Sequence, residues 1–133
     1  MATFRFSLTP GLPIFDQAVF AATKAFVSGE MQPGDPFPSV RALAAELKIN
    51  PNTAAKVVQH LIQEGWLHTS PGKGAVVAPP PKVKAAERQR VLRQDVEQLA
   101  VEARRVGLSL TEVTEALALH WKKLDSAGKV DAA

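Results

Sequence analysis

Apolar residues near the start of the chain recur first with the period of a strand and then with the period of a helix. Residues 4–8 alternate apolar and polar side chains, which predicts a short strand or extended arm. An apolar stripe at helical spacing then runs from Pro13, which suits a first helical turn, to Gly29, a natural stop. The segment from Glu30 to Pro38 holds three prolines, so we expect a connecting loop there.

Two short amphipathic patterns follow this loop within a few residues of each other. Ser39 is a suitable N-cap for a helix whose buried stripe ends at Leu47. Asn50-Pro51 then supplies an N-cap and a first-turn proline for a helix that ends near Gly65. Two short helices so closely spaced, the second opening on polar side chains, are typical of a helix-turn-helix.

A hairpin and a stiff boundary are predicted next. Residues 66–69 and 75–78 suit two strands, and Pro71-Gly72-Lys73-Gly74 suits the tight turn between them, so we expect a wing after the helix-turn-helix. Pro79-Pro80-Pro81 can continue neither a strand nor a helix interior and favours an extended conformation. We therefore expect a linker at residues 79–83.

The last third of the chain predicts two helices. Apolar residues from Leu92 to Val106 recur in alternating steps of four and three, the spacing of a helix that packs lengthwise on another helix, and Gly107 ends it. Ser109 and Glu112 form a capping-box pair at the start of the final helix. The predicted organisation is a winged helix-turn-helix at 1–78, the linker, a two-helix segment at 84–125 and a flexible tail at 126–133. The expected fold class is mainly α with a small β-hairpin.

Composition excludes several classes of protein. There is no cysteine, so disulfides and thiolate chemistry are excluded, and no apolar run is long enough to span a bilayer. We therefore expect a cytoplasmic protein that makes no membrane contact. Residues 1–81 carry six Lys and Arg against five Asp and Glu, and residues 82–133 carry ten against eight. Bulk charge alone therefore does not identify a nucleic-acid binder.

The predicted third helix carries the best candidate contacts to DNA. The positions opposite its core stripe are almost free of acidic residues, and amide and lysine side chains can pair with base edges or phosphate in the major groove. These positions are Asn52, Thr53, Lys56, Gln59, His60 and Gln63. Of the residues on this helix, we expect base contacts from Asn50, Asn52, Thr53 and Lys56. The alternative is that Asn50 and Thr53 only cap the helix and the rest is a solvated face.

Flanking elements favour the DNA-binding interpretation. Arg41 lies on the exposed side of the predicted second helix, where a guanidinium can hold a phosphate or a base, and Ser39 can contact phosphate at the same helix end. Gly72, Lys73 and Gly74 allow a wing tip that approaches the DNA backbone or minor groove.

Catalytic and cofactor motifs are missing from the sequence. The turn at residues 71–74 is not a Walker A loop, no GxGxxG or GxSxG occurs, and the three histidines lack metal-site spacing. Trp66 and Trp121 are better explained as core or interface anchors than as a cofactor cage. We expect no cofactor, no metal and no enzymatic activity.

Several of these motifs together resemble the GntR family of bacterial regulators. The resemblance covers about residues 10–78 and rests on Leu12 to Gln17, Ser28 to Asp35, Phe37 to Ala44, Asn50 to Lys56, Leu61 to Leu67 and Gly72 to Gly74. It implies a winged-helix DNA-binding domain whose contacts come from Ser39, Arg41, Asn50, Asn52, Thr53, Lys56 and the wing residues. The sequence departs from some relatives at Ala55, where other subfamilies have an arginine that can contact DNA, and at Phe37, where leucine is commoner.

The short C-terminal segment resembles that of the YtrA-type subfamily, which implies a homodimer and repression of transcription. A two-fold dimer would read an inverted-repeat operator in double-stranded DNA. We expect the dimer interface to be formed by Leu92, Val96, Leu99, Ala103, Val106, Leu117 and Trp121. Whether a small-molecule effector exists stays open, with a hydrophobic ligand between protomers and regulation by abundance alone as alternatives. The rival function is a winged-helix module for protein docking or nonspecific DNA binding.

Overall fold

The computed structural model describes residues 8–132, with side chains as far as Asp125. Apart from Leu8, the strand predicted at residues 4–8 lies outside the described residues. Contacts along the chain separate an N-terminal unit, residues 1–81, to which the end of the chain from Leu124 is also assigned, from a helical unit, Lys82–Lys123.

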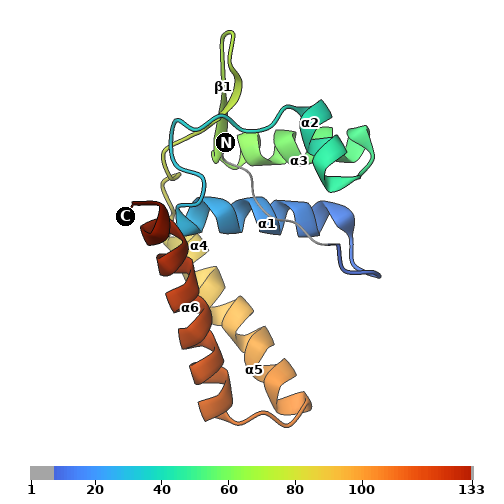
Figure 1. The fold of residues 1–133 in the computed structure, drawn as a ribbon. Helices are drawn as coiled ribbons and strands as arrows, with labels where there is room; N and C mark the ends of the chain where they lie inside the picture. Colours follow the sequence, from blue (N-terminus) through green and yellow to red (C-terminus); the bar gives the residue numbers. More distant parts are fainter. Residues whose placement is uncertain (1–7, 133) are drawn as a thin grey trace. The chain divides into compact units, whose positions relative to one another are not determined.

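The N-terminal unit is a winged helix-turn-helix, as predicted (Figure 1). Its helices are α1 (Ile14–Ser28), α2 (Val40–Leu47) and α3 (Pro51–Gln63), and both α1 and α2 pack against α3. Strands β1 (Leu67–Ser70) and β2 (Gly74–Val77) form an antiparallel hairpin that projects from the helices.

Capping residues fix the ends of the helices at the predicted positions. Gly29 ends α1 in the left-handed conformation at φ 82°. The Ser39 hydroxyl accepts a hydrogen bond from the Ala42 amide (3.1 Å), and the Asn50 side-chain oxygen accepts one from the Asn52 amide (2.7 Å). Each bond satisfies a backbone N–H that the first turn of a helix leaves unpaired.

A continuous apolar core holds the three helices and the base of the wing together. The largest fully buried side chains are Met31, Leu43, Val57 and Leu61. The Phe26 ring stacks on Trp66 at a centroid distance of 5.3 Å and lies 6.1 Å from Phe37, which joins α1, the loop before α2 and the start of the wing. Trp66 is therefore a partly buried residue packed against the core.

The loop before α2 pairs with β2 of the wing through backbone hydrogen bonds and one isolated bridge, which the sequence did not predict. The Gly34 amide donates to the Val77 carbonyl (2.8 Å), the Val77 amide donates to the Asp35 carbonyl (2.9 Å), and the Phe37 amide donates to the Ala75 carbonyl (2.9 Å). Pro36 bridges Val76 in the antiparallel sense. These bonds tie β2 to the loop and so hold the base of the wing against the helical core.

The helical unit consists of two helices joined by a short turn. The first combines α4 (Ala85–Arg90), the π-helical turn η1 (Val91–Asp95) and α5 (Val96–Arg105), and the second is α6 (Leu110–Ala132). The π turn was not predicted, and the Arg90 guanidinium bridges its five residues by pairing with the Asp95 carboxylate at 3.2 Å. The expected capping box is present, because Ser109 Oγ accepts from the Glu112 amide and Glu112 Oε2 accepts from the Ser109 amide.

The backbone of α6 continues to Ala132. The sequence had placed a flexible tail from residue 126 onward, whereas the backbone of residues 126–132 is helical, and Ala133 lies outside the described residues. Within the part of the chain that is described, no helix is long and apolar enough to cross a membrane. The same residues contain no cluster of three or more His, Cys, Asp or Glu side chains that could hold a metal ion.

Candidate nucleic-acid interface

Helix α3 buries one face completely and leaves the opposite face to solvent. Ala54, Val57, Val58 and Leu61 lie in the core at 9% exposure or less. At 100° per residue, the positions farthest from this stripe are Asn52, Lys56, Gln59 and Gln63, and all four are exposed. No acidic residue occurs between Glu46 and Glu64, so α3 presents amides and a lysine without an opposing carboxylate.

The predicted contact residues fall into two groups according to what they do within the chain. Ser39 and Asn50 cap helices with their side-chain oxygens, as expected of the two predicted N-caps. Thr53 is partly buried and does not cap. Arg41, Asn52, Lys56 and Lys73 are exposed, and among the described residues their side chains have neither a hydrogen bond nor an ion pair. These four can meet a ligand without breaking an internal interaction.

The turn between α2 and α3 is short, as in other helix-turn-helix motifs. Only three residues connect the helices, and Lys48 adopts the left-handed conformation at φ 56° and ψ 48°. The Ile49 amide donates back to the Ala44 carbonyl at 3.1 Å, which closes the end of α2. The turn fixes the N-terminal end of α3 beside α2, so Arg41 and Asn52 belong to the same rigid pair of helices.

The wing tip is a tight turn that exposes one lysine. The Lys73 amide donates to the Ser70 carbonyl at 3.0 Å across Pro71 and Gly72, and Gly72 has φ 76°. Proline at the second position and a positive φ at the third are the features of a type II turn. Apart from its chain neighbours, no described residue would lie within 4 Å of a Cβ at Gly72 or Gly74, so the tip can approach another molecule closely.

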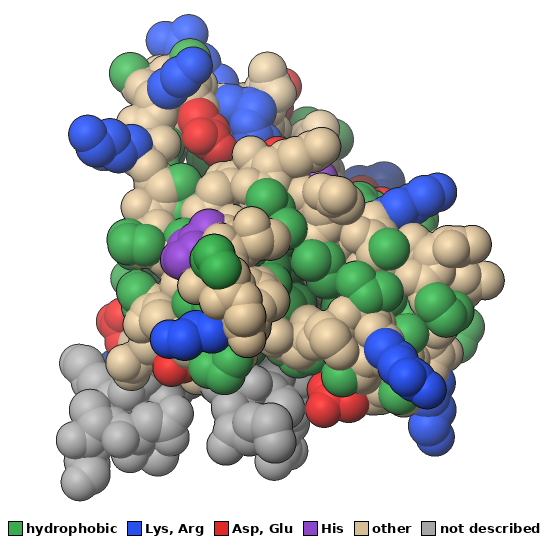
Figure 2. Space-filling view, turned by 90° about the horizontal axis from the view of Figure 1, so that it is seen from above, with side chains coloured by type: hydrophobic (Ala, Val, Ile, Leu, Met, Phe, Trp, Pro, Cys, Tyr) green, Lys and Arg blue, Asp and Glu red, His purple; other side chains and the backbone are tan. Residues whose placement is uncertain are grey.

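Basic side chains on the face of the molecule that carries the wing are dispersed and do not form one patch. Figure 2 looks onto this side and shows basic side chains projecting at its edges, with mainly uncharged side chains between them. This agrees with the near balance of charge in residues 1–81. Recognition by this unit therefore depends on where individual basic and amide side chains stand, rather than on a polycationic surface.

The structure also places a shallow depression beside the outer face of α3. Its volume is about 400 Å³, and it is lined by Phe15 of α1 and by Ala55, Lys56, Gln59, His60 and Gln63 of α3. The Phe15 and His60 rings meet edge to face at 5.4 Å, and His60 Nε2 lies 3.9 Å from the Glu64 carboxylate. The His60 side chain is therefore directed toward α1, whereas Gln59 lies on the exposed outer face of α3.

The helical unit exposes nearly all of its apolar side chains. Of the residues predicted for the dimer interface, Leu92, Val96, Leu99, Val106, Leu117 and Trp121 are between 46% and 68% exposed, whereas Ala103 is buried within its own chain. A groove of about 620 Å³ between α5 and α6 is lined by Val96, Leu99, Ala103, Leu117 and neighbouring residues. Within residues 82–125, Ala103 is the one buried residue. These two helices therefore have no adequate core of their own.

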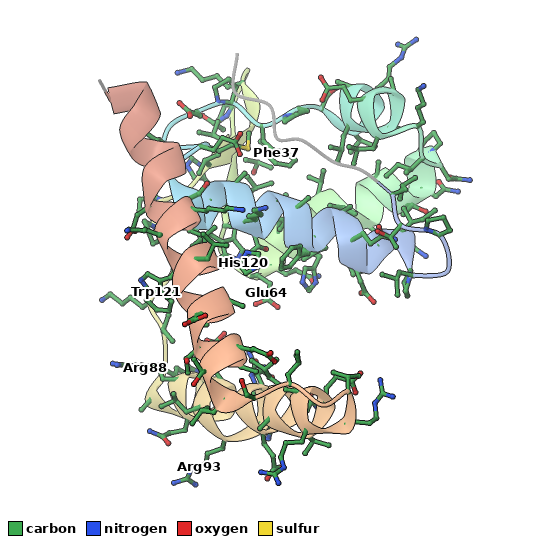
Figure 3. All side chains as sticks on the ribbon, turned by 60° about the horizontal axis from the view of Figure 1, so that its bottom comes forward. Phe37, Glu64, Arg88, Arg93, His120 and Trp121 are labelled. Carbon is green, nitrogen blue, oxygen red and sulfur yellow. The ribbon has the colours of Figure 1, made fainter. Side chains whose placement is uncertain are left out.

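Charged side chains of the helical unit face solvent. Figure 3 shows Arg88 and Arg93 projecting outward from the first helical segment. Arg105 donates hydrogen bonds to the Glu102 carboxylate, which lowers the pKa of Glu102 and raises the pKa of Arg105 from their ordinary values. Because both groups are on the surface, this pair contributes little to stability.

Sequence reasoning missed the support that holds the wing. Pro33, Pro36 and Pro38 predict a loop, and yet the backbone between them pairs with β2. Proline lacks an N–H donor, so a proline-rich segment carries no sequence pattern of a strand, although its remaining amides still pair.

Comparisons with known proteins agree with this geometry. A family model described as bacterial regulatory proteins, gntR family, matches residues 23–77. The chain is 32% identical over 104 residues to the HTH-type transcriptional repressor YtrA of Bacillus subtilis, an alignment that covers 77% of this chain and 80% of that protein. The match therefore extends beyond the winged helix into the C-terminal helices.

Two solved structures share the fold. A transcriptional antiterminator from Listeria monocytogenes superposes with a TM-score of 0.78 at 24% identity, covering 93% of each chain. The YtrA protein of Sulfolobus acidocaldarius, a GntR-family transcription factor, superposes with a TM-score of 0.58 at 26% identity, covering 74% of this chain and 97% of that one.

Proposed function

Because the chain belongs to the GntR family of bacterial regulatory proteins, as a YtrA-type regulator, we propose that it is a repressor that binds an inverted-repeat operator as a homodimer. The observation that carries the proposal is the outer face of α3, where Asn52 and Lys56 are exposed and unpaired in the described structure. The similarity to the B. subtilis repressor supports repression as the direction of control.

The DNA contacts follow from the shape of the winged helix. A helix of about 10 to 12 Å diameter fits the major groove of B-DNA, and α3 would enter it with Asn52, Thr53 and Lys56 toward the base edges. Arg41, on α2, would hold the phosphate backbone, where the N-terminal turn capped by Ser39 also offers backbone N–H groups. The wing tip with Gly72, Lys73 and Gly74 would reach the flanking backbone or the minor groove.

A second copy of the chain would supply the missing partner of the helical unit. Leu92, Val96, Leu99, Val106, Leu117 and Trp121 would be covered by the same surface of the other protomer, around the groove between α5 and α6. A two-fold dimer presents two α3 helices in opposite directions, which matches half-sites about one helical turn, or 34 Å, apart. Binding over a promoter would then exclude RNA polymerase.

Alanine variants of the exposed basic residues test the assignment of the interface. The full-length protein is titrated against its selected operator by fluorescence anisotropy, with Arg41→Ala and Lys56→Ala compared with wild type. Each variant should weaken operator binding by about tenfold or more, because each removes a phosphate or base contact. Lys24→Ala is the control, since Lys24 is an exposed lysine on α1 without an internal partner among the described residues.

The outcomes separate the interface from general charge effects. Wild-type affinity for Lys24→Ala together with weakened binding by the other two variants supports the proposed face. Unchanged operator affinity for both Arg41→Ala and Lys56→Ala would remove the site assignment. Equal weakening by all three variants would indicate nonspecific attraction to a polyanion, which is the rival function.

A further inference from the structure

The outer face of α3 extends beyond the residues expected to touch DNA. Asn52, Lys56 and Gln59 follow one another in steps of four and three, and all three are exposed. We propose that Gln59 is a further base-reading residue of each half-site, which recognises an adenine through its side-chain amide. This inference rests on the proposed function and adds a specificity-determining residue to it.

Helix dimensions place these three residues within a span of four base pairs. At about 1.5 Å per residue, Asn52 and Gln59 are separated by roughly 10 Å along the α3 axis. Three base-pair steps of about 3.4 Å, from the first to the fourth of four successive base pairs, span the same length. Residues about one helical turn apart likewise contact three successive bases when a zinc-finger helix lies in the major groove. The spacing therefore allows Gln59 to follow Lys56 along the groove.

The surroundings of Gln59 favour contact with a base edge over a purely structural role. Its side chain is exposed, and within the described part of the chain it makes no hydrogen bond. It lines the depression of about 400 Å³ together with Ala55, whose small side chain leaves space beside the amide. A glutamine amide can donate to and accept from adenine at once, at N7 and the N6 amino group.

The residues that follow Gln59 are less suited to contact with bases. His60 is turned aside, because its ring packs against Phe15 and faces the Glu64 carboxylate. Gln63 lies one turn beyond Gln59 and precedes Glu64, whose negative charge opposes close approach of the phosphate backbone. Gln59 is thus separated from the acidic Glu64 by more than one helical turn, whereas Gln63 adjoins it, so Gln63 is a matched control of the same residue type.

A base-by-base binding profile tests the inference. An operator is first selected by the full-length wild-type protein from a random duplex library, and affinities for every single-base-pair variant of it are then measured. Gln59→Ala should lose the preference for A·T at one position in each half-site, by about 5- to 140-fold, with the remaining preferences kept. Gln63→Ala should keep the complete wild-type profile.

A change of preference provides the sharper readout. Gln59→Arg should shift the preferred base pair at the same position from A·T to G·C, since arginine pairs with guanine. A merely structural role of Gln59 would produce no such shift. A wild-type profile retained by Gln59→Ala, or a uniform loss over all positions, would overturn this inference alone. A wild-type protein that selects no operator would overturn the inference together with the proposed function.

Discussion

Leu117 and Leu119 offer a matched test of the proposed dimer surface. They lie two residues apart on α6 with exposed fractions of 52% and 54%, but only Leu117 lines the groove between α5 and α6. We compare Leu117→Glu with Leu119→Glu. If the groove is covered by a second copy, a carboxylate at position 117 is buried in the interface, whereas a carboxylate at position 119 stays in water.

The expected effect is large because the interface is two-fold. Leu117 keeps about half of its side chain exposed, so the dimer gains about 1 kcal/mol per copy when that half is covered. An unpaired carboxylate in the same place adds a desolvation cost of at least about 2 kcal/mol. The loss of about 3 kcal/mol occurs twice in a two-fold dimer, and the total of about 6 kcal/mol raises the dissociation constant roughly 10⁴-fold.

Sedimentation equilibrium over a range of protein concentrations measures this dissociation constant directly. Leu117→Glu should sediment as a monomer where the wild type and Leu119→Glu sediment as dimers. Circular dichroism should show that both variants keep their helix content at high concentration. A dimer of Leu117→Glu with wild-type strength, or equal weakening by the two substitutions, would refute the assignment of the groove to the interface.

Two further predictions concern the stability of the separate units, both measured by thermal unfolding. Gly65→Ala should cost about 1–2 kcal/mol from its positive φ of 86°, and more because the added Cβ would lie 3.3 Å from Pro81. Gly11→Ala has a similar φ of 87°, but no described residue outside its chain neighbours lies within 4 Å of the added Cβ, so this variant should lose only the first part. Equal losses would contradict the role of Pro81. Ser109→Ala should destabilise the helical unit by about 1 kcal/mol by removing half of the capping box. Thr114→Ala is its control, because the Thr114 hydroxyl only donates to backbone carbonyls one turn earlier in the same helix. A loss of stability as large as that of Ser109→Ala would argue against the cap.

Helix ends and the helix-turn-helix were predictable from sequence because local chemistry decides them. Gly29, Ser39 and Asn50 each have one favoured place at a helix end, and the structure puts them there. The wing followed from the turn residues at 71–74 between two apolar runs. These features depend on residues close in sequence, so a single chain is enough to infer them.

Features set by contacts distant in sequence, or by backbone geometry, were not predictable in the same way. The pairing of residues 34–37 with β2 depends on the core bringing two segments together. The π turn at Val91–Asp95 leaves no sequence period of its own, and Lys48 adopts a left-handed conformation usually associated with glycine. The exposure of Leu99 and Trp121 could not be inferred from the sequence, because an apolar stripe does not reveal whether the surface that covers it belongs to the same chain.

Competition between operator and random duplex tests the central claim most directly. The full-length protein is titrated by fluorescence anisotropy with DNA from its own promoter and with a selected inverted repeat, over a series of salt concentrations and with excess random duplex. We predict tight binding that survives the competitor, with two protomers per inverted repeat. Equally weak binding to every duplex, lost as salt rises, would contradict the account and identify the winged helix as a nonspecific or protein-docking module.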